Sequence, residues 1–553
     1  MKTRPDSLLS WLAALLPVAA LFGVAACYIE NIPWFDDFES FSGFLIEYLR
    51  ADTWRDKFHW LFIPNNEHRI VAGKLLVLGV YYVSGELNYY WIQLLADFSV
   101  IGIWLLLWLA FRRLQLSLWY FVPVSLLLFH PQYYLLTFWA ITGLQHQLVL
   151  LLVSLTAFCL AKGTWKWYAA AFFFAVLATF SMGNGMFVWA AGAGVLLLRK
   201  RFAQLVLWLA GMAGGMAGYF YHFATKANDD SLAKFFKMPH LSLAGFFTYN
   251  GGLLDLFPDL GEPWRYVLPT IGGLVLIVLV VRWLLVYVYP VIIRYKRPAE
   301  KNPFYTDFLL GILLFLLANS LLIAIMRPHF GYFVMLISNY RLYPILLTCL
   351  VYLGWLQRRR DTLPRPMGIV VASLVICLIS YASYFPKVAN RRALLLASVR
   401  NQYYSSIGLG ATRGSFLEPY IDRTFREPMR TGIFHPPVHF FDAAVSRATE
   451  PEKHTVSIAG TEEMISVQQS TLPVPGGRDA FLLLRIKSET AADDFVIPFE
   501  PAANAGRNPF KRGVGGGAHF YRHMLRPGVY TLEIIQISGS AAKRYPTGQK
   551  LTI

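Results

Sequence analysis

Long apolar segments recur through the first 385 residues of this 553-residue chain, and they constrain its fold more than any motif does. A helix needs about 17 to 25 predominantly apolar residues to cross roughly 30 Å of hydrocarbon. The sequence predicts a polytopic α-helical membrane protein with about eleven transmembrane helices. We place them near residues 8–29, 88–111, 116–130, 144–161, 166–181, 184–198, 202–221, 266–289, 306–326, 341–357 and 367–385.

The composition agrees with a membrane protein. Hydrophobic residues make up 56% of the chain and charged residues only 15%, which is too apolar for a soluble fold of this length. The net charge of +17 could suggest nucleic acid, but the basic residues lie in short clusters between apolar segments. We therefore expect no nucleic-acid partner. The cysteines lie within or at the ends of apolar segments, which indicates no disulfide framework.

The basic clusters predict the orientation of the chain. They fall in alternate loops, and all lie on the cytoplasmic side if the N-terminus is cytoplasmic. With an odd number of spans, the C-terminal region then lies on the outer side, together with a first outer loop at 30–87. Residues 70–84 are short and contain Lys74, so we expect an interfacial helix there. The clusters are Arg112 with Arg113, Lys162 with Lys166, Arg199 to Arg201, Arg294 to Arg297, and Arg358 to Arg360.

The composition changes after Pro386. Residues 386–453 are charged and helix-like, and we expect a helical linker on the outer side. From residue 454 to 553, short β-rich runs alternate with Gly and Pro turns, which predicts a small, sandwich-like all-β domain. The chain would thus divide into a transmembrane catalytic module at 1–385, the linker and this domain. The expected strands are Thr455–Ile458, Met464–Gln468, Ala480–Ile486, Phe495–Pro498, Val529–Ile535 and Leu551–Ile553.

A cluster of carboxylates follows the first apolar segment. The run Pro33-Trp34-Phe35-Asp36-Asp37-Phe38-Glu39 sets three acids among aromatic residues at the depth of the lipid headgroups. Such acids are costly to desolvate, and the economical reason for them is chemistry on a substrate whose polar head lies at that level. We therefore interpret the chain as an integral membrane enzyme. The alternative is that Asp36 and Asp37 are a solvated pair that caps the helix after them.

Further polar residues could complete such a site. Transfer of a sugar from a lipid phosphate needs a carboxylate that removes a proton, which suits Asp36 or Asp37. It also needs cations that hold the departing phosphate, which suits Arg69, Arg327 and Arg341. Alternatively, residues 67–69 form a salt-bridged helix start, and the two later arginines anchor their loop to lipid phosphates. The expected substrate-binding residues are Glu39, Glu67, His68, Arg69, Lys74, Arg327, His329, Asn339, Tyr340 and Arg341.

With its first helix ending in an acidic pair, its long first outer loop, its many spans and its outer C-terminal domain, the chain resembles the GT-C superfamily of polyprenyl-phosphate-sugar-dependent glycosyltransferases. Only Asp36-Asp37 matches the acidic motif of that family residue by residue. The resemblance implies an inverting transfer of a sugar from a polyprenyl-phosphate donor to a glycolipid, polysaccharide or protein acceptor. It implies action at the periplasmic face of the bacterial inner membrane, and it leaves a divalent metal, Mg²⁺ or Mn²⁺, open at Asp36 or Asp37.

Two rival functions remain at this stage. A transporter or lipid flippase would explain Asp97 inside an apolar segment, although the chain has no visible internal repeat. A scaffold of an envelope-assembly machine would use the β domain as its binding module. Elsewhere, we expect Asp255 and Asp259 to be solvated acids and His146 to be a buried helix contact.

Overall fold

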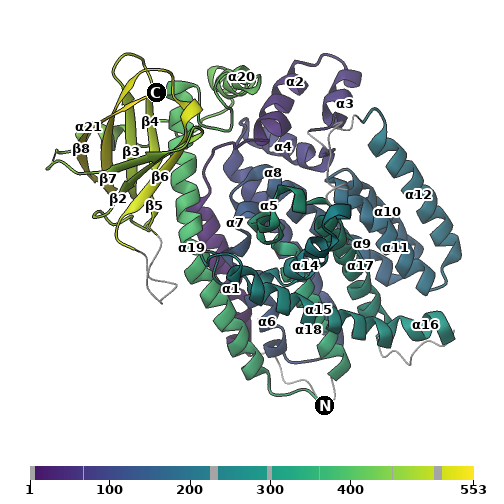
Figure 1. Cartoon of the computed structure of the whole chain (residues 1–553). Coiled ribbons are helices and arrows are strands. Elements are labelled where there is room, and N and C mark those ends of the chain that lie inside the picture. Colours follow the sequence, from purple (N-terminus) through teal and green to yellow (C-terminus); the bar gives the residue numbers. More distant parts are fainter. Residues whose placement is uncertain are drawn as a thin grey trace.

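The computed structural model describes residues 7–65, 68–223, 235–294, 302–359, 362–450, 452–502 and 513–553. The protein is mostly helical, and its strands are confined to the C-terminal region (Figure 1). The helices are α1 (Leu8–Tyr28), α2 (Phe44–Arg50), α3 (Trp54–Phe62), α4 (Val71–Ser84), α5 (Tyr89–Phe111), α6 (Val122–Leu128), α7 (Tyr134–Thr137), α8 (Ala140–Thr142), α9 (Leu148–Lys162), α10 (Trp165–Thr179), α11 (Phe187–Leu198), α12 (Phe202–Phe220), α14 (Pro239–Asn250), α15 (Trp264–Tyr287), α16 (Tyr289–Arg294), α17 (Pro303–Met326), α18 (Leu342–Arg359), α19 (Pro366–Ser405), α20 (Leu417–Arg430) and α21 (Asp442–Arg447).

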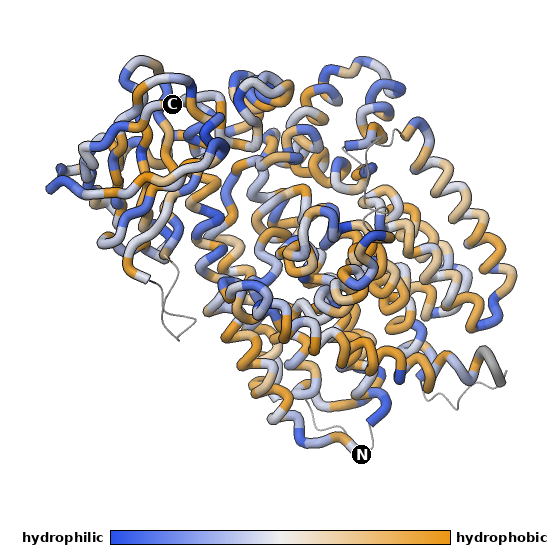
Figure 2. Tube along the Cα trace, in the orientation of Figure 1, coloured by the Kyte–Doolittle hydropathy of each residue, from blue (hydrophilic) through white to orange (hydrophobic). Residues whose placement is uncertain are grey.

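Within the described residues, seven helical segments are long and apolar enough to cross a membrane. Figure 2 shows the apolar residues concentrated along the helices of the bundle. The expected number of about eleven is not confirmed, because several expected spans form shorter helices and residues 116–130 form only short helical pieces. The seven segments are Leu8–Tyr28, Tyr89–Leu114, Ala140–Lys162, Phe202–Phe220, Trp264–Val291, Pro303–Met326 and Pro366–Ser405.

Local sequence signals set several helix ends. The Asn88 side-chain oxygen accepts hydrogen bonds from the backbone N–H groups of Tyr90 and Trp91, with N–O distances of 3.1 and 3.3 Å. Asn88 is therefore the N-cap residue of α5. Helix α4 ends at Gly85, whose φ of 74° is a left-handed conformation that glycine adopts without steric cost. These signals separate α4 from α5 and leave α4 with only 14 residues.

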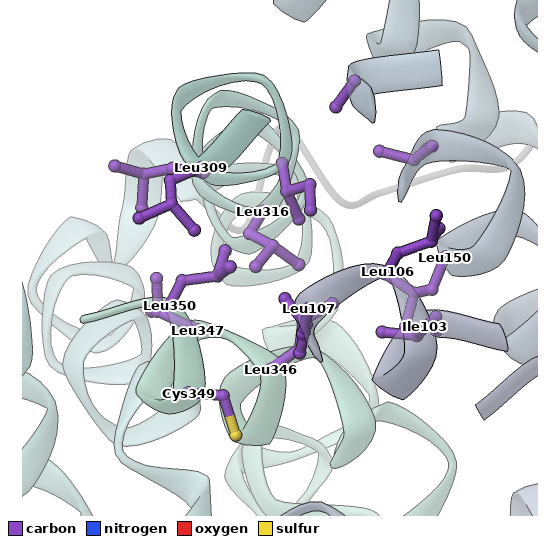
Figure 3. Packing of buried hydrophobic residues seen from close by; sticks show 14 of the residues in the cluster. Ile103, Leu106, Leu107, Leu150, Leu309, Leu316, Leu346, Leu347, Cys349 and Leu350 are labelled. Carbon is purple, nitrogen blue, oxygen red and sulfur yellow. The ribbon is translucent and has the colours of Figure 1, made fainter. Parts of the chain in front are cut away.

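Helices that are far apart in the sequence share one apolar core. Figure 3 shows leucines of α5, α9, α17 and α18 packed against one another, among them Leu107, Leu150, Leu316 and Leu346. Lipid tails are as apolar as leucine, so in a bilayer such helices associate through close packing and polar contacts rather than through exclusion of water. The core therefore holds the bundle together by the fit of its side chains.

The C-terminal region consists of two antiparallel four-stranded sheets. One has the order β1 (Ser457–Gly460), β2 (Met464–Gln469), β6 (Gly516–Tyr521), β5 (Glu500–Pro501). The other has the order β4 (Asp494–Pro498), β3 (Ala480–Ser488), β7 (Val529–Ser538), β8 (Ala541–Thr552). Residues such as Val467, Phe520, Leu484 and Ile534 of the two sheets share a core, so the prediction of a C-terminal β region is confirmed.

Two strands were missing from the sequence prediction. Strand β6 begins at Gly516, where a Cβ atom would lie 2.4 Å from the carbonyl oxygen of Glu500 in β5. The glycine therefore permits the close approach of the two backbones. A glycine run favours a turn in the sequence, and only the pairing with β2 and β5 makes it a strand.

Helix α19 joins the helical bundle to the sheets. It continues through Pro386 to Ser405, so the expected boundary at residues 385 and 386 lies inside one helix. Its C-terminal half packs against the second sheet, and the Asn401 side chain bonds both the N–H and the carbonyl oxygen of Val496, at 2.8 and 2.9 Å. The change of composition at Pro386 thus marks a change of surroundings and not the end of a helix.

Candidate functional site

The acidic turn, which we define as residues 34–39, holds one of its acids inside the protein. The Asp37 side chain is 1% exposed. One carboxylate oxygen accepts the backbone N–H of Trp34 at 2.9 Å, and the other accepts that of Ile141 in α8 at 2.8 Å. Asp37 is therefore not a solvated cap of the following helix, as the alternative interpretation had it; instead it joins the turn to α8.

The electrostatics of Asp37 follow from this burial. Loss of solvation raises the pKa of Asp37 to about 8, while the two backbone N–H donors lower it and the neighbouring charge of Asp36 raises it. Because the Asp37 carboxyl group is buried and both of its oxygens accept backbone N–H groups, it suits the positioning of the backbone better than contact with a substrate.

Asp36 has the opposite surroundings, because its side chain is exposed. The preceding residue, Phe35, has φ of 46°, a conformation that is strained for a bulky residue, and its N–H donates to the carbonyl oxygen of Leu409 at 3.2 Å. A π-helix, η1 (Phe38–Gly43), begins directly after the acidic pair. Strained turns and π-helical segments are frequent at functional sites. The turn presents Asp36, together with the exposed Glu39, at the protein surface.

A buried arginine of α19 lies beside the acidic turn. The Arg391 guanidinium lies 4.7 Å from the Trp34 ring and 5.9 Å from the Trp139 ring, and the Trp139 indole donates to the carbonyl oxygen of Trp34 at 3.0 Å. The Nη2 atom of Arg391 is buried and has no hydrogen-bond partner among the residues that the structure describes. Arg391 was not among the predicted site residues; its signal was an arginine pair, Arg391 and Arg392, shortly after an apolar segment.

Three of the expected substrate-binding residues converge on His146, which lies in the π-helix η5 (Gly143–Gln147). His68 and Arg327 lie within electrostatic range of His146. The Tyr340 ring contacts the His146 ring edge to face, with 5.4 Å between centroids. The His146 ring also bonds the Tyr343 hydroxyl at 2.9 Å. Residues from separate parts of the chain therefore meet at one place in the bundle.

The contacts of His146 extend into a buried polar cluster. The Asn184 amide donates to the Tyr343 hydroxyl at 2.9 Å and to the Asn319 side chain at 2.8 Å. Asn319 in turn donates to the Tyr249 hydroxyl at 2.9 Å. Together with His146, residues of five helical regions of the bundle thus share one hydrogen-bond network.

Arg69 and Lys74, in contrast, bind the protein itself. Arg69 is 5% exposed and donates to the carbonyl oxygens of Tyr219, Phe62 and Tyr221. The Lys74 amine is fully buried, donates to two carbonyl oxygens at 3.0 Å, and has a pKa lowered by burial to about 7 despite the nearby charge of Glu39. Both side chains are buried and hold the segment before α4 in place.

Arg341 also has internal partners. It is 1% exposed and donates to Asp255 and to the carbonyl oxygens of Gly252 and Leu336. Asp255 accepts further bonds from Arg265 at 2.6 Å and from the Tyr384 hydroxyl at 2.8 Å. The prediction that Asp255 is solvated is wrong. Burial acts to raise the pKa of Asp255, but the two arginines outweigh it and hold the pKa below its usual value.

The other expected residues are more open or less constrained. Arg327 is partly exposed and lies 5.7 Å from the Phe330 ring, and the His329 ring bonds the carbonyl oxygen of Met326 at 2.7 Å. The Asn339 side-chain oxygen is buried, and none of the described residues bonds to it. Glu67 lies outside the described residues.

The described residues do not fit a complete metal site. Among them, no group of three or more His, Cys, Asp or Glu side chains could hold an ion. Both carboxylate oxygens of Asp37 accept backbone N–H groups. We therefore derive no step through Mg²⁺ or Mn²⁺.

Comparison of the chain with protein-family descriptions, with curated proteins and with solved structures gives no match. The functional conclusion therefore depends on the residues themselves and on their geometry.

Proposed function

We propose that the protein is an inverting membrane glycosyltransferase that moves a sugar from a polyprenyl-phosphate donor to an envelope acceptor, with Asp36 as the base. One observation carries the proposal: two adjacent aspartates have opposite environments. Asp37 is buried and bonded to two backbone N–H groups, whereas Asp36 is exposed on a strained turn. In such an arrangement one acid positions the turn, and the other is thereby held at a fixed place on the surface.

The reaction is a single displacement. The Asp36 carboxylate accepts the proton of the acceptor hydroxyl as its oxygen attacks the anomeric carbon of the sugar. The bond between that carbon and the phosphate oxygen breaks, and the electron pair leaves with the polyprenyl phosphate. A positioned base of this kind contributes about 10² to 10⁴ in rate.

The departing phosphate needs a cation. Arg391 is the best candidate, because it lies beside the acidic turn and one of its guanidinium nitrogens has no hydrogen-bond partner within the described part of the chain. Arg327, partly exposed near His146, is the second. Arg69 and Arg341 have no place in the proposal, since their guanidinium groups are bound to protein oxygens.

In this proposal the C-terminal sheets receive the acceptor. They are attached to the same helix, α19, that carries Arg391, so an acceptor on the sheets would lie close to the donor site. Truncation of the β region after Ser446 should then reduce transfer to the natural acceptor more than hydrolysis of the donor by water.

A transporter is the second candidate, because of Asp97. This carboxyl group is 4% exposed inside α5, accepts a bond from Gln147 at 2.8 Å, and interacts with the side chain of Thr137. Buried acids of this kind often mark the path of an ion or a substrate. A transporter would move lipid between the leaflets of a vesicle without releasing sugar.

The test is an assay with the purified full-length protein in liposomes that contain radiolabelled polyprenyl-phosphate sugars. We expect release or transfer of sugar, and a fall of about 100-fold or more in Asp36→Asn with donor binding retained. Asp52→Asn is the matched control, because Asp52 is another exposed acid of the same segment. A near-native rate in Asp36→Asn would reject this base, and lipid movement without sugar release would favour the transporter.

A further inference from the structure

A cavity of about 400 Å³ lies between α15, α17 and α18, away from the acidic turn. Its walls are mostly aliphatic and include Leu279, Leu309, Leu313 and Val351. This volume lies within the range of about 300 to 1,000 Å³ that is typical of ligand pockets. An apolar cavity among helices of this kind suits a hydrocarbon chain.

One end of the cavity is basic. Arg282, Arg358 and Arg359 line it there, and within the described part of the chain none of the three guanidinium groups pairs with a carboxylate. Arg359 ends α18, whose 18 residues begin next to Arg341, so the basic end lies roughly 27 Å along the helix from the Arg341–Asp255 pair. Guanidinium groups without acidic partners favour an anionic ligand.

A side chain of the cavity wall also carries a hydrogen-bond donor without a partner. Trp283, next in sequence to Arg282, lines the cavity, and its indole N–H is buried beside Gly354 with no acceptor among the described residues. A buried donor of this kind costs free energy unless a ligand or water supplies an acceptor. A phospholipid has ester carbonyl groups directly below its phosphate, whereas a polyprenyl phosphate has only hydrocarbon there.

From these observations we propose that the cavity between α15, α17 and α18 binds one anionic phospholipid. Its phosphate lies at the three arginines, an ester carbonyl accepts the Trp283 N–H, and an acyl chain fills the aliphatic part. The site is separate from the proposed glycosyltransferase site, and it does not depend on that function.

The test is native mass spectrometry of the full-length protein, released from vesicles that contain phosphatidylglycerol, phosphatidylcholine or a polyprenyl phosphate. We expect one retained phosphatidylglycerol and little retained phosphatidylcholine. The double variant Arg358→Gln with Arg359→Gln should reduce retention about tenfold or more, and thermal unfolding checks that it is folded. Equal retention of the first two lipids, or unchanged retention in a folded double variant, would reject the proposal.

A second pair of variants tests the aliphatic part of the site. Val351→Trp fills the cavity and should abolish retention, whereas Val375→Trp, at a position of α19 that is 49% exposed, should leave retention unchanged. Loss in both variants, or in neither, would contradict binding in this cavity. Preferential retention of the polyprenyl phosphate would also overturn the proposal and would assign the cavity to that lipid.

Discussion

The Asp37 carboxylate accepts the backbone N–H of Ile141 at 2.8 Å, although 104 positions separate the two residues. The bond joins the acidic turn to α8, and η5 with His146 follows α8 directly. The strained Phe35 and the two π-helical segments therefore lie in one connected part of the protein. This contact distinguishes the two acids of the pair, since it buries Asp37 and leaves Asp36 at the surface.

Asp37 makes stability dependent on pH. Its pKa is about 8 in the folded protein, whereas the ordinary value is 3.8. At a pH between these two values, the folded state therefore holds a proton that the unfolded state has lost. The contribution of Asp37 is therefore complete below about pH 4 and declines as the pH rises to about 8, by at most about 1.4 kcal/mol per pH unit.

Asp37→Asn should remove this decline. Thermal unfolding in detergent at about pH 5, 7 and 9 measures it. The variant should be less stable than the wild type at low pH, because one backbone N–H loses its acceptor at a cost of about 1 to 3 kcal/mol. Lys74 also titrates in this range, but it is present in both proteins and cancels in their difference. Parallel pH curves would show that Asp37 is ionised throughout.

Arg391→Lys should weaken donor binding. The planar guanidinium of Arg391 lies on Trp34 and can bind two phosphate oxygens at once, which a lysine amine cannot reproduce. We therefore expect the affinity for polyprenyl phosphate to fall about tenfold, and the transfer rate to fall with it. Titration with the donor lipid measures the affinity. Arg423→Lys is the control, because that side chain is 49% exposed. Lower stability with unchanged donor affinity would indicate a purely structural arginine.

We expect Asp494 to contribute to the attachment of the β region to α19. This carboxylate pairs with Arg400 of α19 at 3.0 Å and with Arg485 of β3 at 2.9 Å. Asp494→Asn leaves both guanidinium groups without this partner and should cost about 3 kcal/mol, seen as earlier protease cleavage of the β region. Asp479→Asn, at a side chain that is 63% exposed, should change stability by less than about 0.5 kcal/mol. Equal sensitivity of both variants would contradict this role.

The predicted orientation can be tested in intact cells. In a cysteine-free background, a cysteine next to Arg113, Lys200 or Arg359 should be protected from a membrane-impermeant thiol reagent, because positive loops favour the cytoplasm. A cysteine at the exposed Ser470 of the β region should react. Labelling after lysis controls for buried positions. Reaction at the basic loops in intact cells would reverse the orientation.

Much of the architecture follows from local patterns. The length of the apolar segments predicted the long helices, and short β-rich runs between Gly and Pro turns predicted most strands, including Ala480 to Ile486 of β3. The number of spans did not follow, because Val122 to Leu128 forms a helix of only seven residues. The composition of a segment indicates how apolar it is, but the packing of its side chains against the rest of the protein decides whether the segment forms one continuous helix.

The sequence by itself determined that the chain carries apolar helices, a C-terminal β region and an acidic pair after its first helix. Only the tertiary structure decided which acid is exposed, that Arg341 and Asp255 pair inside the protein, and that Arg391 lies beside the acidic turn. Neighbouring aspartates have the same intrinsic chemistry. Their difference comes from burial and from hydrogen bonds to segments far away in the sequence, which local pattern does not encode.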